Sequence, residues 1–431
     1  MDNRPTWLLV VASIGFLVGG CKHLFSPVDF QPGVAPEIKD AVPPACAAAS
    51  PPPDKGEAKR LARRREARAW MVNLGKDGAL YAVKAVGPMG GESASAVTTA
   101  AGDVVLVGSV LGPELTCEQP MLIVLAPDGH ERNTFVLPFP GRLQSVLSLP
   151  DGGFLAGGQL ADNQKPDRRH LAFISRLTAS GEVVWTRIAD GLDEGIVSIR
   201  NQGDHALVFG VQDLADTWRI RTDWDAKSIT MDPVANLVTH AILVAPEGDL
   251  LLLGQATWAR YDGYARNVPT LVRLGADGRN LRARTYFGSY AENAGRFETA
   301  AWLSHGEILA AGYLDRPIDT ACLTRLNAHG RQTWSQCLPS SASIIAVAPV
   351  PTDRALVCMQ SDGYDQETRS HVNEYELHLV WLDDKKLKSL PLGTSGAQMT
   401  VCRTLTTMSD GTIVALGAGK WLSTSERKEA R

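Results

Sequence analysis

LAFISRLTASGEVVWTRIADGLDEGIVSIRNQGDHALVFG, residues 171–210, decides the fold, because close variants of this stretch recur along most of the chain. It contains two apolar hairpin patterns in series. The first turns at Ser180-Gly181 and places Trp185 four residues after the glycine, and the second turns at Gly203-Asp204 and ends at Gly210. Glycine accepts the positive φ of a two-residue turn without steric cost, so each pattern predicts a tight β-hairpin.

Each of the two turns belongs to a family with seven members. The first family comprises Asp77-Gly78, Asp128-Gly129, Ser180-Gly181, Asp277-Gly278 and His329-Gly330, with degenerate members at Asp225–Lys227 and Asp383–Lys385. The second comprises Gly102-Asp103, Asp151-Gly152, Gly203-Asp204, Gly248-Asp249, Gly306-Glu307, Asp353-Arg354 and Asp410-Gly411. A period of about 50 residues therefore holds two hairpins and four strands, and such units repeated radially are propeller blades. The sequence predicts an all-β fold, a seven-bladed β-propeller of four-stranded antiparallel blades.

The order of the hairpins predicts how the ring closes. If strands are named A to D from the axis outward, the chain begins with a C–D hairpin at Ala69–Val83 and ends with an A–B hairpin at Met399–Leu416. We expect the two terminal hairpins to complete the seventh blade together, because pairing removes their exposed edges. Consecutive apolar residues, as in Leu250–Leu253, indicate strands covered on both faces. Close backbone approach is expected where glycines end these strands, at Gly108, Gly157, Gly210, Gly254 and Gly312.

Composition bounds the functional class. The chain has 431 residues, of which 44% are hydrophobic, enough for a sizeable core. Its net charge of −4 argues against nucleic acid as a main partner, because phosphate binding needs clustered Lys and Arg with a basic balance. No cofactor is expected.

The N-terminus has the pattern of a secretory signal over residues 1–20, with Arg4 before an apolar run from Trp7 to Val18. Residues 17–21, LVGGC, resemble the lipobox of bacterial lipoproteins. That resemblance implies a mature chain that begins at a lipidated Cys21, whereas the alternative is an ordinary secreted protein with a chance cysteine. Lys22 after the cysteine favours the outer membrane, so we expect a periplasmic or surface-facing envelope protein attached to a membrane through its lipid.

Two linking segments separate this N-terminus from the repeats. Residues 21–56 are rich in Pro and Ala and predict an extended tether that holds the folded part off the membrane. The sequence of residues 57–68, EAKRLARRREAR, predicts a basic helical linker. This linker is either a clamp on anionic lipid phosphates or a solvated helix. The propeller is expected over residues 69–421, and a disordered tail over 422–431.

Two repeat units carry a family resemblance. Phe173–Ile188, FISRLTASGEVVWTRI, and Leu323–Leu338, LTRLNAHGRQTWSQCL, resemble the SBBP-type and related quinoprotein-like propeller repeats of bacterial surface proteins. Phe287–Tyr290 resembles the glycine-containing crossover of the same repeats. The resemblance implies architecture and not activity, because such propellers serve as enzymes, scaffolds and adhesins. A quinoprotein dehydrogenase would usually carry a vicinal disulfide, and the chain has no adjacent Cys-Cys pair. The tryptophans are expected to pack between blades.

The cysteines predict disulfides and no metal. Cys322 and Cys337 flank the His329-Gly330 turn symmetrically, which places them opposite each other on neighbouring strands and suits a bond in an oxidising compartment. Cys358 and Cys402 either bond across two blades or remain small buried side chains. A bond between Cys46 and Cys117 is a further option. No Cys-x-x-Cys or His-x₃-His spacing indicates zinc.

Catalytic motifs are absent from the sequence, which has no Gly-x-Ser-x-Gly elbow, HExxH, phosphate loop or EF-hand loop. Four long B–C loops are expected on one face of the ring, namely 111–119, 161–169, 258–267 and 361–375. Two of them hold aromatic and charged residues typical of interfaces, or are plain solvated loops. The candidate binding residues are Trp258, Tyr261, Tyr264, Tyr364, Asp365, His371 and Tyr375.

The working hypothesis is a monomeric, lipid-anchored envelope propeller that binds a protein or glycan through its B–C loop face without catalysis. A subtype would be a scaffold that resembles the propeller lipoproteins assisting outer-membrane barrel insertion. The competing hypothesis is a hydrolase, lyase or oxidoreductase with its site at the mouth of the central channel. Polar residues clustered near the axis would favour the enzyme, and an apolar axis would exclude it.

Overall fold

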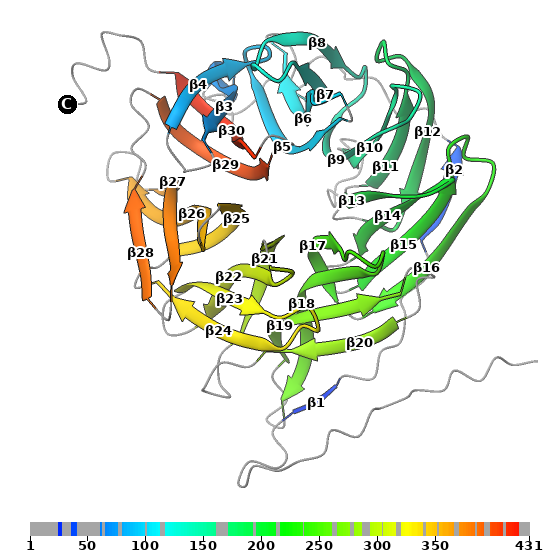
Figure 1. The fold of residues 1–431 in the computed structure, drawn as a ribbon. Helices are drawn as coiled ribbons and strands as arrows, with labels where there is room; N and C mark the ends of the chain where they lie inside the picture. The colour runs from blue at the N-terminus through cyan, green and yellow to red at the C-terminus, as the bar shows by residue number, and fades with distance from the viewer. Residues whose placement is uncertain are drawn as a thin grey trace, which may run out of the picture.

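The strands form seven separate antiparallel sheets around a common axis in the computed structural model, so the fold is a seven-bladed β-propeller (Figure 1). The structure describes residues 25–27, 36–40, 61–62 and 65–421, except for the connecting segments 76–79, 100, 113–116, 161–170, 193–194, 213–215, 236, 261–264, 276–279, 287–293, 304, 316–319, 339–341, 351–352, 366–369, 384–385, 392–396 and 408–410. The predicted signal over 1–20 and the predicted tail over 422–431 lie outside these residues.

The first four blades follow one another along the chain, each built from strands A to D in order. Blade 1 comprises β5 (Gly91–Thr98), β6 (Val104–Leu111), β7 (Glu118–Leu125) and β8 (Glu131–Val136). Blade 2 comprises β9 (Gly141–Ser148), β10 (Phe154–Leu160), β11 (Leu171–Leu177) and β12 (Val183–Asp190). Blade 3 comprises β13 (Gly195–Gln202), β14 (His205–Gln212), β15 (Asp216–Asp223) and β16 (Ile229–Ala235). Blade 4 comprises β17 (Val238–Val244), β18 (Leu250–Arg260), β19 (Ala265–Leu274) and β20 (Asn280–Thr285).

The last three blades include the one shared by both ends of the chain. Blade 5 comprises β21 (Ala294–Trp302), β22 (Ile308–Asp315), β23 (Thr320–Leu326) and β24 (Gln332–Cys337). Blade 6 comprises β25 (Ala342–Val350), β26 (Arg354–Asp365), β27 (Ser370–Asp383) and β28 (Lys386–Pro391). Blade 7 comprises β29 (Ala397–Thr407), β30 (Ile413–Trp421), β3 (Arg68–Leu74) and β4 (Leu80–Val86).

Blade 7 confirms the predicted closure, because β30 from the C-terminal end pairs with β3 from the N-terminal end. The register runs from Arg68 opposite Gly419 to Leu74 opposite Ile413, and Met71 lies opposite Leu416. Met71 and its partner Leu416 are both buried, and so are Leu74 and its partner Ile413. The ring therefore has no open blade edge at the point where the chain begins and ends its repeats.

Turn chemistry explains why the repeats are regular. Gly181 and Gly330 in C–D turns and Gly203 in an A–B turn have φ of 81°, 71° and 72°, in the left-handed region that glycine reaches without strain. At two turns that lack this glycine, a non-glycine residue adopts a positive φ instead, 55° at Ala226 and 52° at Asp353. The backbone thus keeps the same turn even where the sequence signal is lost.

A β-bulge recurs on the innermost strand of every blade. The bulged residues are Ala94, Gln144, Val197, His240, Glu298, Ile345 and Arg403. In six blades the residue before the bulge lies opposite a glycine of the B strand, as Thr239 lies opposite Gly254. A Cβ at Gly254 would collide with the Val238 carbonyl oxygen. The expected close backbone approach is present at Gly108, Gly254 and Gly312, whereas a Cβ at Gly210 would first meet the Leu192 side chain. In blade 2 the approach falls on Gly158, and Gly157 meets the Ile196 side chain.

The core consists of apolar clusters that lie between neighbouring blades. Phe139 and Phe173, for example, make an edge-to-face contact with ring centroids 5.2 Å apart in the cluster between blades 1 and 2. Trp185 packs against the cluster shared by blades 2 and 3, and Trp334 against that shared by blades 5 and 6. The Trp185 Nε1 donates a hydrogen bond to the Trp224 carbonyl of the next blade at 3.2 Å. The tryptophans of the repeat therefore bind blade to blade.

The arginine of the repeat pattern has a matching structural role. Arg176, which lies opposite Trp185, donates to Asp151 in its own A–B turn at 2.6 Å and to Asp225 in the next blade at 2.8 Å. The Gly153 amide and then Arg176 hold the pKa of the Asp151 carboxyl below its usual range. The arginine of the repeat pattern therefore has a structural role, because it joins its own blade to the next one.

Candidate functional site

Topology sorts the connections of the propeller onto two faces. Because successive strands in each blade are antiparallel, every A–B and C–D turn lies on one face and every B–C and D–A connection lies on the other. We call these the turn face and the connection face. Residues for recognition are expected on the connection face, since the turn face consists of short turns of nearly constant length.

The hairpin of β18 and β19 extends the connection face at blade 4. The pairing of β18 with β17 ends at Gln255, but its pairing with β19 continues to Ala259 opposite Ala265. Trp258, which we predicted to lie in a loop, is a strand residue opposite Arg266. Tyr261 and Tyr264 lie between the two strands, outside the described residues.

The hairpin of β26 and β27 extends the same face at blade 6. Its ladder continues past the end of β25, which pairs with β26 up to Ser361, and reaches Asp365 opposite Ser370. Tyr364 lies directly opposite His371, and Tyr375 lies opposite Gln360. The prediction of a loop is therefore wrong for residues 361–365 and 370–375, because strand pairing continues where polar residues and Gly363 suggested a loop. All four predicted residues of this segment belong to a paired β-ribbon.

Two strands from the N-terminal segment add to the outside of the ring. β1 (Phe25–Pro27) pairs with the extended part of β18, with Phe25 opposite Arg260 and Pro27 opposite Trp258. β2 (Glu37–Asp40) pairs with β12 as a fifth strand of blade 2. The Lys39 ammonium lies 3.0 Å from Glu37 and 3.2 Å from Asp190, and both carboxylates raise its pKa, Glu37 more strongly. The segment predicted as an extended tether thus contains two short strands that pair with the ring.

The basic linker also contacts the folded ring. Leu61, Ala62, Arg65 and Glu66 are helical, and the Leu61 side chain is buried. Arg68, which we assigned to the linker, is the first residue of β3 and donates a hydrogen bond to the Gly87 carbonyl at 2.6 Å. The buried leucine shows that this helix is not solvated on all sides.

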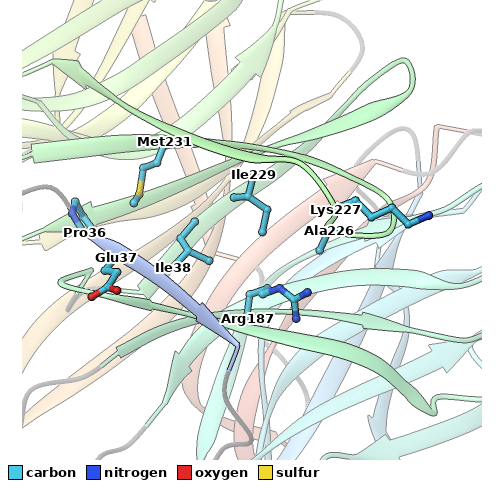
Figure 2. A pocket seen from close by; sticks show the side chains of 8 residues that line it. All are labelled: Pro36, Glu37, Ile38, Arg187, Ala226, Lys227, Ile229 and Met231. Atoms are coloured by element: carbon cyan, nitrogen blue, oxygen red, sulfur yellow. The ribbon is translucent and has the colours of Figure 1, made fainter.

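A cavity of about 460 Å³ lies between blades 2 and 3, and β2 forms one of its walls (Figure 2). Its apolar side chains include Ile38 from β2 and Ile229 and Met231 from β16, which pack on the cluster between the two blades. Its other lining residues are Pro36, Glu37, Arg187, Ala226 and Lys227. The carboxylate of Glu37 and the ammonium of Lys227 are mostly exposed, and no lining residue holds a buried polar atom without a partner. β2, which pairs with β12, closes one side of this cavity.

The innermost strand of each blade faces the axis of the ring (Figure 1). Three of the bulged residues, His240, Glu298 and Arg403, take part in polar contacts between neighbouring blades. Arg403 of blade 7 lies 3.2 Å from Glu92 of blade 1, and the Nδ1 of His240 of blade 4 lies 3.8 Å from the carboxylate of Glu298 of blade 5. The structure therefore does not show the apolar axis that would have excluded an enzyme.

The His240 cluster is the most unusual of these polar groups. Arg296 donates to the Glu298 carboxylate and lies 5.1 Å from the ring centroid of Tyr313. Burial lowers the pKa of His240, which Glu298 partly opposes, and the Nε2 of the ring is buried without a hydrogen-bond partner. A neutral imidazole, a carboxylate and a guanidinium thus converge at the inner ends of two blades. The sequence gives one signal for His240 and Glu298, a polar residue fourteen positions before a glycine that lies within a B strand.

Two disulfides are present among the described cysteines. Cys322 and Cys337 lie opposite each other on β23 and β24 with Cα atoms 4.0 Å apart and are bonded. Cys358 of β26 and Cys402 of β29 are bonded across blades 6 and 7. Cys117 is buried and disulfide-bonded as well. The predicted lipidation site, Cys21, lies outside the described residues.

The described part of the chain holds no group of three or more His, Cys, Asp or Glu side chains that could bind a metal ion. In the same part, no helix has the length and apolar character needed to cross a bilayer.

No protein-family model matches the chain, and no curated protein sequence matches it either. Among solved structures, a protein of unknown function from Bacteroides caccae is 14% identical, with 63% of this chain and 94% of that chain covered and a TM-score of 0.40. A second protein of unknown function, from Dyadobacter fermentans, is 12% identical over 82% of this chain and 98% of its own, with a TM-score of 0.41. A prolyl endopeptidase is 11% identical over 84% of this chain and 56% of its own, with a TM-score of 0.46. None of these similarities bears on function.

Proposed function

We propose that the chain is a lipid-anchored β-propeller of the bacterial cell envelope that binds a protein or glycan through its connection face, without catalysis. The observation that carries the proposal is the β26–β27 hairpin, which stays paired for four residues of β26 beyond the last residue paired with β25. A ribbon held by its own backbone hydrogen bonds loses little conformational entropy when it binds.

The residues on this ribbon suit recognition. Its register pairs Tyr364 with His371, and Tyr375 follows His371 four residues later on β27, an even spacing along the strand. Aromatic residues dominate the centres of interfaces, where they contribute large contact area at low entropic cost. We infer that these three residues contact the partner and that Asp365 adds polar specificity at the rim.

Affinity capture tests this role. Purified mature protein should retain a macromolecule from envelope extract, and a Tyr364→Ser/His371→Ser/Tyr375→Ser variant should lose it. The matched control is Asp204→Ser/His329→Ser, which changes exposed residues on the turn face. Partner retention that is the same for all three proteins would contradict binding through this hairpin.

The lipid anchor is a separate part of the proposal. The lipobox-like residues 17–21 support attachment through Cys21, and Lys22 supports the outer membrane as its destination. Cys21→Ser should abolish incorporation of a labelled fatty acid and yield unprocessed or released protein. Labelling that persists in the variant would refute the anchor. Size-exclusion chromatography of the detergent-free Cys21→Ser protein should give a monomer.

A second candidate function is an enzyme, a hydrolase, lyase or oxidoreductase with its site near the axis. The buried Nε2 of His240 beside Glu298 favours it, because a neutral imidazole oriented by a carboxylate is a common general base. Screening of ester, peptide and glycoside substrates with wild type and His240→Gln tests the candidate. Turnover that depends on His240 would support an enzyme over a binding module.

A further inference from the structure

The N-terminal strand β1 fixes the direction in which a lipid anchor would leave the propeller. We propose that the connection face lies against the membrane and that the outer end of the β18–β19 ladder, where Ala259 pairs with Ala265, stands near the lipid headgroups. This orientation rests on the lipid anchor proposed above. The occupant at the end of the β18–β19 ladder is then a lipid surface, and the β26–β27 hairpin on the same face binds a macromolecule that itself lies at the membrane.

The pairing of β1 provides the direction. β1 is antiparallel to β18, so its first residue, Phe25, lies opposite Arg260 at the outer end of the hairpin, and Pro27 lies opposite Trp258 further in. The chain before Phe25 therefore starts from the end of the hairpin and not from the body of the ring. Cys21 precedes Phe25 by four residues.

Chain length then limits the distance to the membrane. Four extended residues span at most about 14 Å. A diacylglycerol on Cys21 would accordingly be held within about 14 Å of the hairpin end. A free tether over residues 21–56 would instead have an r.m.s. reach of roughly 30–36 Å and would leave the propeller without a fixed orientation. The attachment of β1 to β18, and of β2 to β12, removes that freedom.

The composition of the hairpin suits a lipid surface. Trp258 and Arg266 lie opposite each other near its end, and Arg260 is the last residue of β18. Tryptophan is enriched at the boundary between hydrocarbon and headgroups, and each arginine near an anionic surface contributes about 1 kcal/mol of attraction. The same composition would suit a macromolecular partner. Lipid is favoured because Cys21 precedes Phe25 by only four residues.

Energy transfer to labelled lipid tests the orientation. The full mature lipoprotein carries one introduced cysteine, Asn267→Cys in the hairpin or Asp204→Cys in the turn face. Both side chains are exposed; Asn267 accepts a hydrogen bond from Thr257, and Asp204 contacts His205. Asn267 lies opposite Thr257, seven residue steps from Leu250 at the turn-face end of β18, so the two positions are separated by roughly 23 Å along the strand direction. Each protein is labelled with fluorescein maleimide and reconstituted in phosphatidylethanolamine–phosphatidylglycerol vesicles that contain a rhodamine lipid.

The proposal expects markedly higher transfer efficiency from residue 267 than from residue 204. Equal transfer, or higher transfer from residue 204, would overturn the orientation and leave the hairpin free for a macromolecular partner. Flotation of the same vesicles with wild type and Cys21→Ser reports on the anchor separately. Loss of flotation only in Cys21→Ser, together with equal transfer, would retain the anchor and reject the orientation. A wild-type chain that does not float would reject both.

Discussion

Cys358 on the B strand of blade 6 and Cys402 on the A strand of blade 7 are joined by a disulfide, with Cα atoms 6.4 Å apart. This bond crosses the boundary between the last blade formed by contiguous sequence and the blade shared by both ends of the chain. The alternative of two small buried side chains is therefore replaced by a covalent link beside the closure.

The first prediction concerns the energy of this link. A Cys358→Ala/Cys402→Ala variant should unfold at a lower urea concentration, because the reduced chain regains the entropy of a loop whose ends are 44 residues apart, about 4 kcal/mol. The matched variant Cys322→Ala/Cys337→Ala opens a loop of 15 residues within one hairpin and should lose about 3 kcal/mol. A larger loss in the second variant would contradict the loop-length argument.

The second prediction concerns closure. Deletion of residues 400–416 should unfold the whole ring, because it removes most of β29 and the four residues of β30 that pair with Met71–Leu74. Circular dichroism and limited proteolysis should show loss of all blades together and not of blade 7 alone. Deletion of 422–431 is the control and should leave the melting temperature unchanged. A stable, protease-resistant fragment after the first deletion would refute cooperative closure.

Local turn chemistry explains why so much of the fold could be predicted from the sequence. Gly181 and Gly203 mark turns whose geometry depends on a few neighbouring residues, and the order of those turns determines blade number and closure. Pairings between distant segments leave no such local signal. Nothing around Phe25 indicates that it pairs with Arg260, and the pairing of Tyr364 with His371 extends a ladder through polar sequence. The His240–Glu298 contact depends on how two blades meet, which the spacing of turns does not specify.

The third prediction separates two glycine roles. Gly254→Ala should destabilise the protein by about 3 kcal/mol or more, because the added Cβ collides with the Val238 carbonyl oxygen and one strand has to move. Gly203 has φ of 72° and nothing within 4 Å of a built Cβ. Gly203→Ala should therefore cost only about 1–2 kcal/mol of backbone strain. Urea unfolding of both variants measures the difference, and equal losses would show that close approach is not the reason for Gly254.

The fourth prediction concerns pH. Burial lowers the pKa of His240 in the folded state below its ordinary value of 6.5, so at acidic pH the unfolded state binds a proton that the folded state does not. Stability should accordingly fall as the pH is lowered from 6.5 toward the folded-state pKa of His240. His240→Gln should make the free energy of unfolding less dependent on pH across this window, with His329→Gln on an exposed turn as the control. An unchanged slope in His240→Gln would show that the imidazole is not held neutral.

The last prediction concerns the disulfide partner of Cys117, which bears on the lipid anchor. Cys117 is disulfide-bonded, and four of the remaining six cysteines bond to one another, which leaves Cys21 and Cys46 as its candidate partners. If the Cys21 sulfur carries a lipid as a thioether, it cannot form a disulfide, so peptide mapping of the unreduced protein should recover a Cys46–Cys117 peptide. Cys46→Ser should then leave Cys117 reactive toward maleimide after unfolding without reductant. Recovery of a Cys21–Cys117 peptide would instead exclude lipidation of that molecule. Such a bond would tie the N-terminal segment to blade 1 and remove the basis of the proposed orientation on the membrane.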